Sequence, residues 1–152
     1  MGSKYPNNCP AGTFNPSTEK SKPTDCLSCT AGFYCAGSTE LSPSGLTGPC
    51  KDGYYCTGGS KIPNQFAADP GYFAKAGYTN QAKCLAGTYN PFVAQKECQG
   101  CPAGYKCSTQ GMSTLEDCPA GSYCPANSFA ETKCDPGYFN DQTNGKSASD
   151  CK

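Results

Sequence analysis

Cysteine is the residue type in this sequence that is best suited to chemistry. The chain has 14 cysteines in 152 residues and no histidine. Cys26 with Cys29, and Cys98 with Cys101, have the two-residue spacing of zinc ligands and of thiol redox motifs. A zinc site would need a matching second pair or histidines, and a redox motif would need alternating strands and helices around it. Each of the two pairs lacks a matching second pair, the sequence has no histidine, and no alternation of strands and helices surrounds either pair. We therefore expect disulfides, with no metal and no cofactor.

The cysteine spacing divides the chain into two similar blocks and a remnant. Intervals of two and five residues are the same in both blocks, whereas the longer intervals differ. Fixed short intervals indicate a geometric requirement, and variable long ones indicate surface loops. We therefore expect cysteine-rich modules over 9–56 and 84–124, a cysteine-free hinge or degenerate repeat over 57–83, and a partial third module over 125–152.

Spacing alone does not fix the disulfide connectivity, because four cysteines already allow three pairings. The simplest pairing closes each long opening loop on itself and crosses the four remaining cysteines of each block. It joins Cys9–Cys26, Cys84–Cys98, Cys134–Cys151, Cys29–Cys50, Cys35–Cys56, Cys101–Cys118 and Cys107–Cys124. A bridge that closes a loop of about 15 residues contributes roughly 3 kcal/mol in the chain-entropy model. We therefore expect reduction to unfold the protein.

An internal repeat recurs along the whole sequence. Each repeat has an opening residue, two further residues, a glycine, and an aromatic residue at the fifth or sixth position. Repeats 1 to 8 open at Cys9, Cys29, Cys50, Ala68, Cys84, Cys101, Cys118 and Cys134, which lie 16 to 21 residues apart. Repeat 4 has alanine where the others have cysteine. A glycine fixed in a repeated turn indicates a positive φ or a close approach of another segment.

The segments between the repeats are rich in Ser, Thr, Pro, Gly and Asn and show no helical periodicity. Leu, Ile, Val and Phe together supply only 14 residues. A chain with so little apolar surface orders only when it is cross-linked. We expect a small disulfide-rich fold of tandem modules with short β-hairpins, loops and almost no helix, apart from one helical turn at Ser128–Lys133.

Charge and residue types exclude several classes of function. Twelve lysines balance twelve acidic residues, and there is no arginine to recognise phosphate or base edges in a bidentate way. We expect no nucleic-acid partner and no direct insertion into a membrane, since no apolar run approaches 20 residues. We also expect no enzyme activity and no catalytic residues. Glu116–Asp117 is the nearest approach to paired carboxylates and is more simply a solvated loop.

Cysteine usage also predicts the compartment. So many cysteines indicate an oxidising environment, although the first residues lack the apolar core of a signal peptide. We expect a processed piece of a secreted protein, located outside the cell or at its surface.

Four phrases of the sequence resemble a known family, the ephrin-receptor-like cysteine-rich repeats. They are CPAGTFNP, CTAGFYC, CKDGYYC and CQGCPAGYKC. Such repeats are abundant in large surface proteins of protists, occur in animal receptors, and are similar in style to tumour-necrosis-factor-receptor and EGF-like modules. The resemblance covers Cys9–Cys56 and Cys84–Cys151. It implies an elongated, extracellular series of small modules with the self-loop and crossed pairing given above.

The resemblance leaves two classes of function open. The first is a structural protein, a segment or subunit of a surface filament, coat or matrix that assembles head to tail. The second is a receptor or adhesin ectodomain that binds a protein ligand. Its candidate contact surface is the cysteine-free stretch Thr57–Lys83, with Tyr72, Phe73 and Tyr78 exposed.

Carbohydrate is a further candidate partner. The sequence has no acceptor for N-linked sugar, because Pro16 blocks the one match. The loops rich in Ser, Thr and Pro are candidates for O-linked sugar, as in mucin-like segments. The candidate acceptors are Thr18, Thr24, Ser42 and Ser44.

Overall fold

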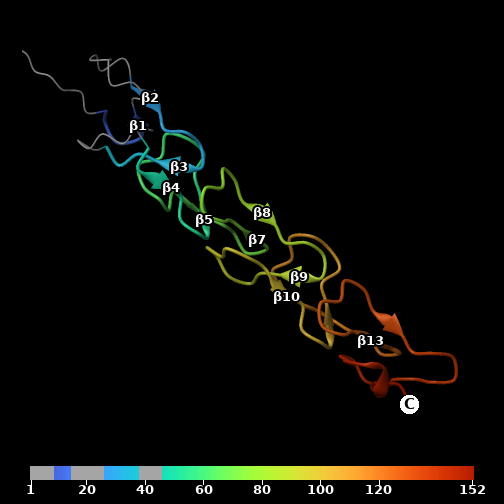
Figure 1. The fold of residues 1–152 in the computed structure, drawn as a ribbon. Coiled ribbons are helices and arrows are strands. Elements are labelled where there is room, and N and C mark those ends of the chain that lie inside the picture. The colour runs from blue at the N-terminus through green and yellow to red at the C-terminus, as the bar shows by residue number, and fades with distance from the viewer. Residues whose placement is uncertain (1–8, 15–25, 38–45) are drawn as a thin grey trace, which may run out of the picture. The chain divides into compact units, whose positions relative to one another are not determined.

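The computed structural model describes residues 9–14, 26–37 and 46–152. These residues form a series of two-stranded antiparallel hairpins in tandem (Figure 1). The pairs are β1 (Thr13–Phe14) with β2 (Leu27–Ser28), β3 (Phe33–Tyr34) with β4 (Gly48–Pro49), β5 (Tyr54–Tyr55) with β6 (Phe66–Ala67), β7 (Tyr72–Phe73) with β8 (Ala82–Lys83), β9 (Thr88–Tyr89) with β10 (Gln99–Gly100), β11 (Tyr105–Lys106) with β12 (Glu116–Asp117), and β13 (Ser122–Tyr123) with β14 (Thr132–Lys133).

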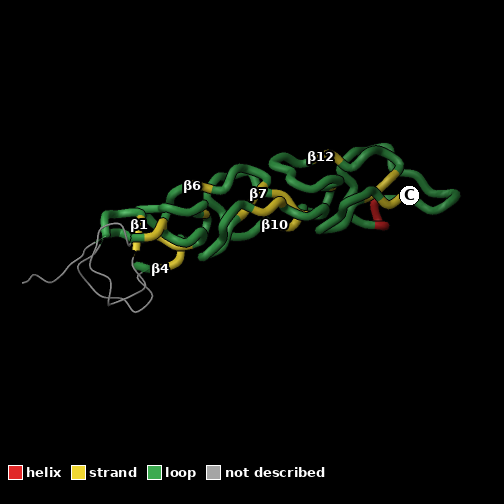
Figure 2. The backbone as a smooth tube through the Cα atoms, turned by 90° about the horizontal axis from the view of Figure 1, so that it is seen from above, coloured by secondary structure: helices red, strands yellow, loops and turns green. Residues whose placement is uncertain are grey.

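Loops make up most of the described chain, and the one helical element in it is the 3₁₀ turn η2 (Ala148–Asp150) (Figure 2). The predicted fold class is therefore confirmed: disulfide-rich hairpins in tandem with almost no helix. The predicted helical turn at Ser128–Lys133 is wrong. Its last two residues form β14 and pair with β13, while the Ser128 hydroxyl donates to the Pro125 carbonyl across a tight turn.

Each hairpin starts in the same glycine turn. In repeats 1 to 6 and in repeat 8 the N–H of the fifth residue donates to the carbonyl of the second, as Thr13 does to Pro10 and Thr88 to Leu85, both at 3.0 Å. The glycine at the fourth position has a φ between +83° and +93° in all eight repeats. A positive φ at the third residue of the turn is what a type II turn requires, and it favours glycine.

The chain divides into two compact units. Unit 1 comprises Met1–Ala68 and Ala74–Gln81, and unit 2 comprises Asp69–Phe73 and Ala82–Lys152. The division falls inside 57–83, the segment predicted to be a hinge or a degenerate repeat. Strands β6, β7 and β8 lie in this segment; β7 and β8 form a hairpin of the same kind as its neighbours, and β6 completes the hairpin that β5 begins.

Two backbone hydrogen bonds join each repeat to the next. The N–H of the glycine donates to the carbonyl of position 7 in the following repeat, counted from the opening residue. The carbonyl of the same glycine accepts from the N–H of position 1 in the following repeat. The glycines bonded in this way are Gly12, Gly32 and Gly53 in unit 1, and Gly71, Gly87, Gly104 and Gly121 in unit 2. Because only backbone groups take part, the same stacking accepts different side chains.

Three of the seven predicted disulfides are confirmed, and they are the three that close the long loops. They are Cys9–Cys26, Cys84–Cys98 and Cys134–Cys151. The four crossed bridges, Cys29–Cys50, Cys35–Cys56, Cys101–Cys118 and Cys107–Cys124, are wrong. The structure instead pairs positions 1 and 7 of the same repeat, as Cys29–Cys35, Cys50–Cys56, Cys101–Cys107 and Cys118–Cys124.

The reason is the glycine that the two cysteines share. Cys50 donates its N–H to the carbonyl of Gly32, and Cys56 accepts from the N–H of the same glycine. This arrangement sets the two Cα atoms 6.2 Å apart, within the range that a disulfide spans. The stacking of one repeat on the preceding one therefore selects the local pairing.

The buried apolar residues are almost all cysteines. Among the described residues the exceptions are Ala68 and Ala74, both 0% exposed. They occupy positions 1 and 7 of repeat 4, and they bond Gly53 as Cys50 and Cys56 bond Gly32. The alanine that breaks the cysteine pattern is thus one of a pair, in the place where repeats 2, 3, 6 and 7 have a disulfide.

We expect the double variant Ala68→Cys/Ala74→Cys to form an eighth disulfide. In the four equivalent pairs the Cα atoms are 5.9 to 6.2 Å apart. Closing so short a loop should raise the free energy of unfolding by about 2 kcal/mol. Thiol titration and denaturant unfolding check this, with Ala68→Cys alone as the control. Two reactive thiols in the folded, oxidised double variant would show that the positions are not equivalent.

Candidate functional site

Repeats approach one another closely at the position-4 glycines of repeats 1, 5 and 6, and we call this approach, with the two backbone hydrogen bonds to the next repeat, the stacking contact. A Cβ built on Gly104 would lie 2.9 Å from the carbonyl oxygen of Asn144, and one on Gly87 would lie 2.9 Å from that of Asn127. The same holds for Gly12 and the carbonyl of Gly59, at 2.7 Å. In each case the carbonyl belongs to the repeat after next, so three consecutive repeats meet there.

The residues that supply these carbonyls also have a positive φ. It is +67° at Gly59, +66° at Asn127 and +64° at Asn144. The N–H of Asn144 donates to the carbonyl of Cys118 at 2.8 Å, and its side-chain amide donates to the carbonyl of Gly104 and the carboxylate of Asp117, each at 2.9 Å. Asparagine tolerates the left-handed region better than other non-glycine residues. This explains why Asn127 and Asn144 can take the place that Gly59 has in its repeat.

Asparagine at position 7 was not predicted to have a role in stacking. Asn90 is 0% exposed, and its amide donates to the carbonyl of Tyr72 in the preceding repeat at 2.8 Å. Asn140 donates in the same way to Ser122 at 3.2 Å. The sequence signal was available, because these repeats have asparagine at position 7 where the bridged repeats have cysteine.

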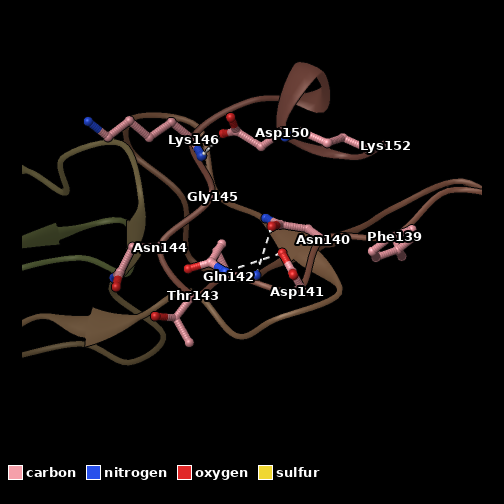
Figure 3. Close-up of a pocket in the computed structure, with 10 residues that line it drawn as sticks. All are labelled: Phe139, Asn140, Asp141, Gln142, Thr143, Asn144, Gly145, Lys146, Asp150 and Lys152. Carbon is pink, nitrogen blue, oxygen red and sulfur yellow. Dashed lines mark hydrogen bonds between the residues drawn. The ribbon is translucent and has the colours of Figure 1, made fainter.

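A hollow of about 350 Å³ lies in the loop of repeat 8, between Phe139 and Lys152 (Figure 3). Its polar groups bond one another. The N–H of Gln142 donates to the side-chain oxygen of Asn140 at 3.0 Å, and the side-chain amide of Gln142 donates to Asp141 at 3.3 Å. These bonds hold the loop itself, so we assign the hollow a structural role.

A carboxylate also fixes the end of this loop. Asp150 accepts from the backbone N–H of Lys146 at 2.6 Å and from that of Ser147 at 3.2 Å. The bonds from Lys146 and then Ser147 hold the pKa of Asp150 below its ordinary value. The ionised form is therefore the one that fits the loop.

Acid should weaken the hydrogen bonds that Asp150 accepts in this loop. Because the pKa of Asp150 is lower in the folded state, its contribution is fully present above its ordinary pKa, about 3.9, and is lost as the pH falls below that value. We expect the amide NMR signals of Lys146 and Ser147 to shift together with the Asp150 carboxylate during an acid titration. Asp150→Asn is the control, and its amide signals should not follow that titration.

The predicted contact residues lie within the hairpin series. Tyr72 and Phe73 form β7, and both are half-buried, as is Tyr78, whose carbonyl accepts from the N–H of Cys56. The expectation that they are exposed is wrong, because strand residues at positions 5 and 6 are partly covered in the first seven repeats. Their role as a contact surface stays a prediction. Thr18, Thr24, Ser42 and Ser44 lie outside the described residues.

The acidic pair is also part of a hairpin. Glu116 and Asp117 form β12 and are not the solvated loop predicted from the sequence. Lys106 in β11 of this hairpin forms a 2.7 Å ion pair with Glu131, which directly precedes β14 of the next hairpin. The hydrogen bond between these two side chains raises the pKa of Lys106 and lowers that of Glu131. Both groups are charged at neutral pH, and the pair braces β11 from the outside.

Within the described ranges, no group of three or more His, Cys, Asp or Glu side chains is arranged to hold a metal. No helix in the same ranges has the length and apolar character needed to cross a membrane. A comparison with known protein-family models finds no match, and one with curated proteins also finds none. The resemblance to ephrin-receptor-like repeats therefore stays a prediction.

Proposed function

We propose that this chain is an extracellular structural protein, a segment or subunit of a surface filament, coat or matrix. The observation that supports this best is the stacking contact. In each unit the same two backbone hydrogen bonds join a repeat to the next, and at Gly12, Gly87 and Gly104 an added Cβ would also meet a carbonyl. The described surface between these contacts is formed by loops of differing length. Such a design maintains a repeated geometry while leaving the loop sequences free to vary.

The disulfides support an extracellular setting. Seven bridges in 152 residues are typical of an oxidising compartment, where disulfides form and persist. Four of them close a loop within a single repeat, with a sequence separation of six residues. Bridges of this kind hold each repeat even when a neighbour opens, which suits a protein exposed to proteases and shear.

The partners that we propose follow from the same role. They are other proteins of the surface layer or further copies of this chain, stacked head to tail, with O-linked sugar on the Ser/Thr-rich loops. The chain acts as a member of the ephrin-receptor-like class of repeats and has no catalytic activity. The half-buried state of Tyr72, Phe73 and Tyr78 gives less support to the alternative of a receptor or adhesin module.

Immunogold labelling of unpermeabilised cells tests this function. An antibody against 84–152 should label a continuous coat, filament or matrix, and the label should survive extraction with mild detergent. A reductant added to the detergent should release it. Label that appears only after permeabilisation would contradict an extracellular structural role. Label extracted by detergent alone would also contradict it and would direct attention to a membrane-bound receptor.

A further inference from the structure

The loop of repeat 8 contains a chemically labile pair, Asn144 followed by Gly145 (Figure 3). It is the one Asn–Gly pair of the sequence. The fold favours both residues, because Asn144 has a φ of +64° and a Cβ built on Gly145 would lie 2.9 Å from the carbonyl oxygen of Ser122. Glycine has no side chain, so its backbone nitrogen can approach the side-chain carbonyl carbon of the preceding asparagine. The pair is therefore a candidate site for deamidation.

The reaction needs only water as a co-reactant. The backbone nitrogen of Gly145 attacks Cγ of Asn144, the bond from Cγ to Nδ2 breaks, and the proton of the Gly145 N–H leaves with Nδ2 as ammonia. The product is a cyclic succinimide. Water then opens the ring at one of its two carbonyls, which leaves aspartate or isoaspartate at position 144.

The stacking contact holds the groups that must move in this reaction. Nδ2 of Asn144 donates to the carbonyl of Gly104 and to the carboxylate of Asp117, each at 2.9 Å, so both N–H groups of the amide are in use. Gly145 is buried, and its carbonyl accepts from the N–H of Cys124 at 2.8 Å. The amide must leave both acceptors before Cγ can turn toward the nitrogen of Gly145. Repeat 8 therefore protects Asn144 while it is stacked on repeat 6.

Deamidation would also change the contact itself. A carboxylate has no N–H to donate, so the carbonyl of Gly104 and the carboxylate of Asp117 would both lose a hydrogen bond. The new negative charge would lie beside that of Asp117, which is unfavourable. Isoaspartate would in addition lengthen the main chain by one carbon at the residue whose carbonyl lies over Gly104. Either product disfavours the stacked arrangement.

We propose that Asn144 is a deamidation site that the stacking contact controls. Asn144 stays intact while repeat 8 is stacked on repeat 6, reacts when this contact opens, and then prevents the contact from closing again. An opening that lasts long enough for the reaction becomes permanent. The inference adds a modification site to the fold, and it holds whether or not the chain is part of a surface layer.

Asn127 is the matched comparison within the chain. It has the corresponding place in repeat 7, with a φ of +66°, and its N–H donates to the carbonyl of Cys101 at 2.6 Å. The residue that follows it is Ser128, whose side chain hinders the attack of the backbone nitrogen. We expect Asn127 to react much more slowly than Asn144 wherever both are free.

Parallel incubation of the oxidised, folded protein and of the reduced protein in guanidinium chloride, at one pH and temperature, tests the proposal. After reduction and alkylation, trypsin cuts after Lys106, Lys133 and Lys146, so Asn127 and Asn144 lie in different peptides for mass spectrometry. We expect Asn144 to deamidate in the denatured protein and about tenfold or more slowly in the folded one, because only molecules with the contact open can react. Equal rates in the two states, or an Asn144 that stays intact in the denatured protein, would overturn the proposal.

Two variants of the folded protein test the control by the contact. Asp117→Ala removes one of the two acceptors and should speed the deamidation of Asn144 about threefold or more. Asp141→Ala is the matched control, because it removes a carboxylate of the repeat 8 loop that bonds Gln142, and it should leave the rate unchanged. An unchanged rate in Asp117→Ala, or the same increase in both variants, would show that the hydrogen bonds to Asn144 do not control the reaction.

The effect of the product is tested by Asn144→Asp. We expect faster amide hydrogen exchange at Cys124, whose N–H donates to the carbonyl of Gly145, with the exchange at Cys84 unchanged. Exchange at Cys124 that equals that of the original protein would contradict the claim that deamidation keeps the contact open.

Discussion

Reduction of the disulfides is expected to unfold both units completely. The buried apolar residues of the described chain are cysteines, with the exceptions of Ala68 and Ala74. A bridge over seven residues contributes about 2 kcal/mol and one over 15 to 18 residues about 3 kcal/mol, so the seven together contribute on the order of 15–20 kcal/mol. This exceeds the net stability of a typical domain.

The measurement is circular dichroism in the near ultraviolet together with amide hydrogen exchange, before and after a phosphine reductant. We expect loss of the aromatic signal and loss of amide protection at the position-4 glycines and the position-1 cysteines. The oxidised protein in the same buffer with phosphine oxide is the control. Protection that persists in the fully reduced protein would mean that the backbone ladder is stable without its bridges.

Gly104→Ala is expected to lower the free energy of unfolding by about 2–5 kcal/mol. A non-glycine residue at a φ of +93° costs roughly 1–2 kcal/mol. The added Cβ would also lie 2.9 Å from the carbonyl of Asn144, which overpacking penalises by a further 1–3 kcal/mol or so. The effect should reach the neighbouring repeats, because Gly104 bonds both Cys118 and Cys124.

Gly121→Ala separates the cost of the positive φ from the cost of the close approach of a carbonyl. Its φ is +83°, but its Cβ would have no atom within 4 Å. It should lose only the strain of about 1–2 kcal/mol. Denaturant unfolding of the oxidised proteins compares the two variants. Equal losses at Gly104 and Gly121 would show that the close approach of the carbonyl contributes nothing.

The repeat, its glycine and the hairpins could be predicted from sequence because they are local. The turn from Pro10 to Thr13 lies within one repeat, and the order of residue types fixes it. The loop bridges, such as Cys84–Cys98, were also correct, because closing a loop on itself needs no knowledge of the next repeat. At these positions the residue types and the backbone geometry of a single repeat favour the same structure.

The stacking of repeats could not be predicted, and the errors follow from that. The choice between Cys101–Cys107 and the crossed pairing depends on Gly87, which lies in the preceding repeat and bonds both cysteines. Ala68 was identified as a lost cysteine, but its partner Ala74 is evident only once position 7 is known to lie beside position 1. The burial of Tyr72 depends in the same way on neighbouring segments.

The local pairing is the central claim of this account, and peptide mapping without reduction tests it most directly. Trypsin cuts after Lys83, Lys96, Lys106 and Lys133, and an enzyme that cuts before Asp117 separates the two cysteine pairs of the second block. Mass spectrometry should find peptides 84–96, 97–106 and 107–116 joined in one species. Peptide 117–133, which contains the Cys118–Cys124 bridge, should be free of the others. Finding peptide 117–133 linked to 97–106 or 107–116 would contradict the local pairing and the stacking that selects it.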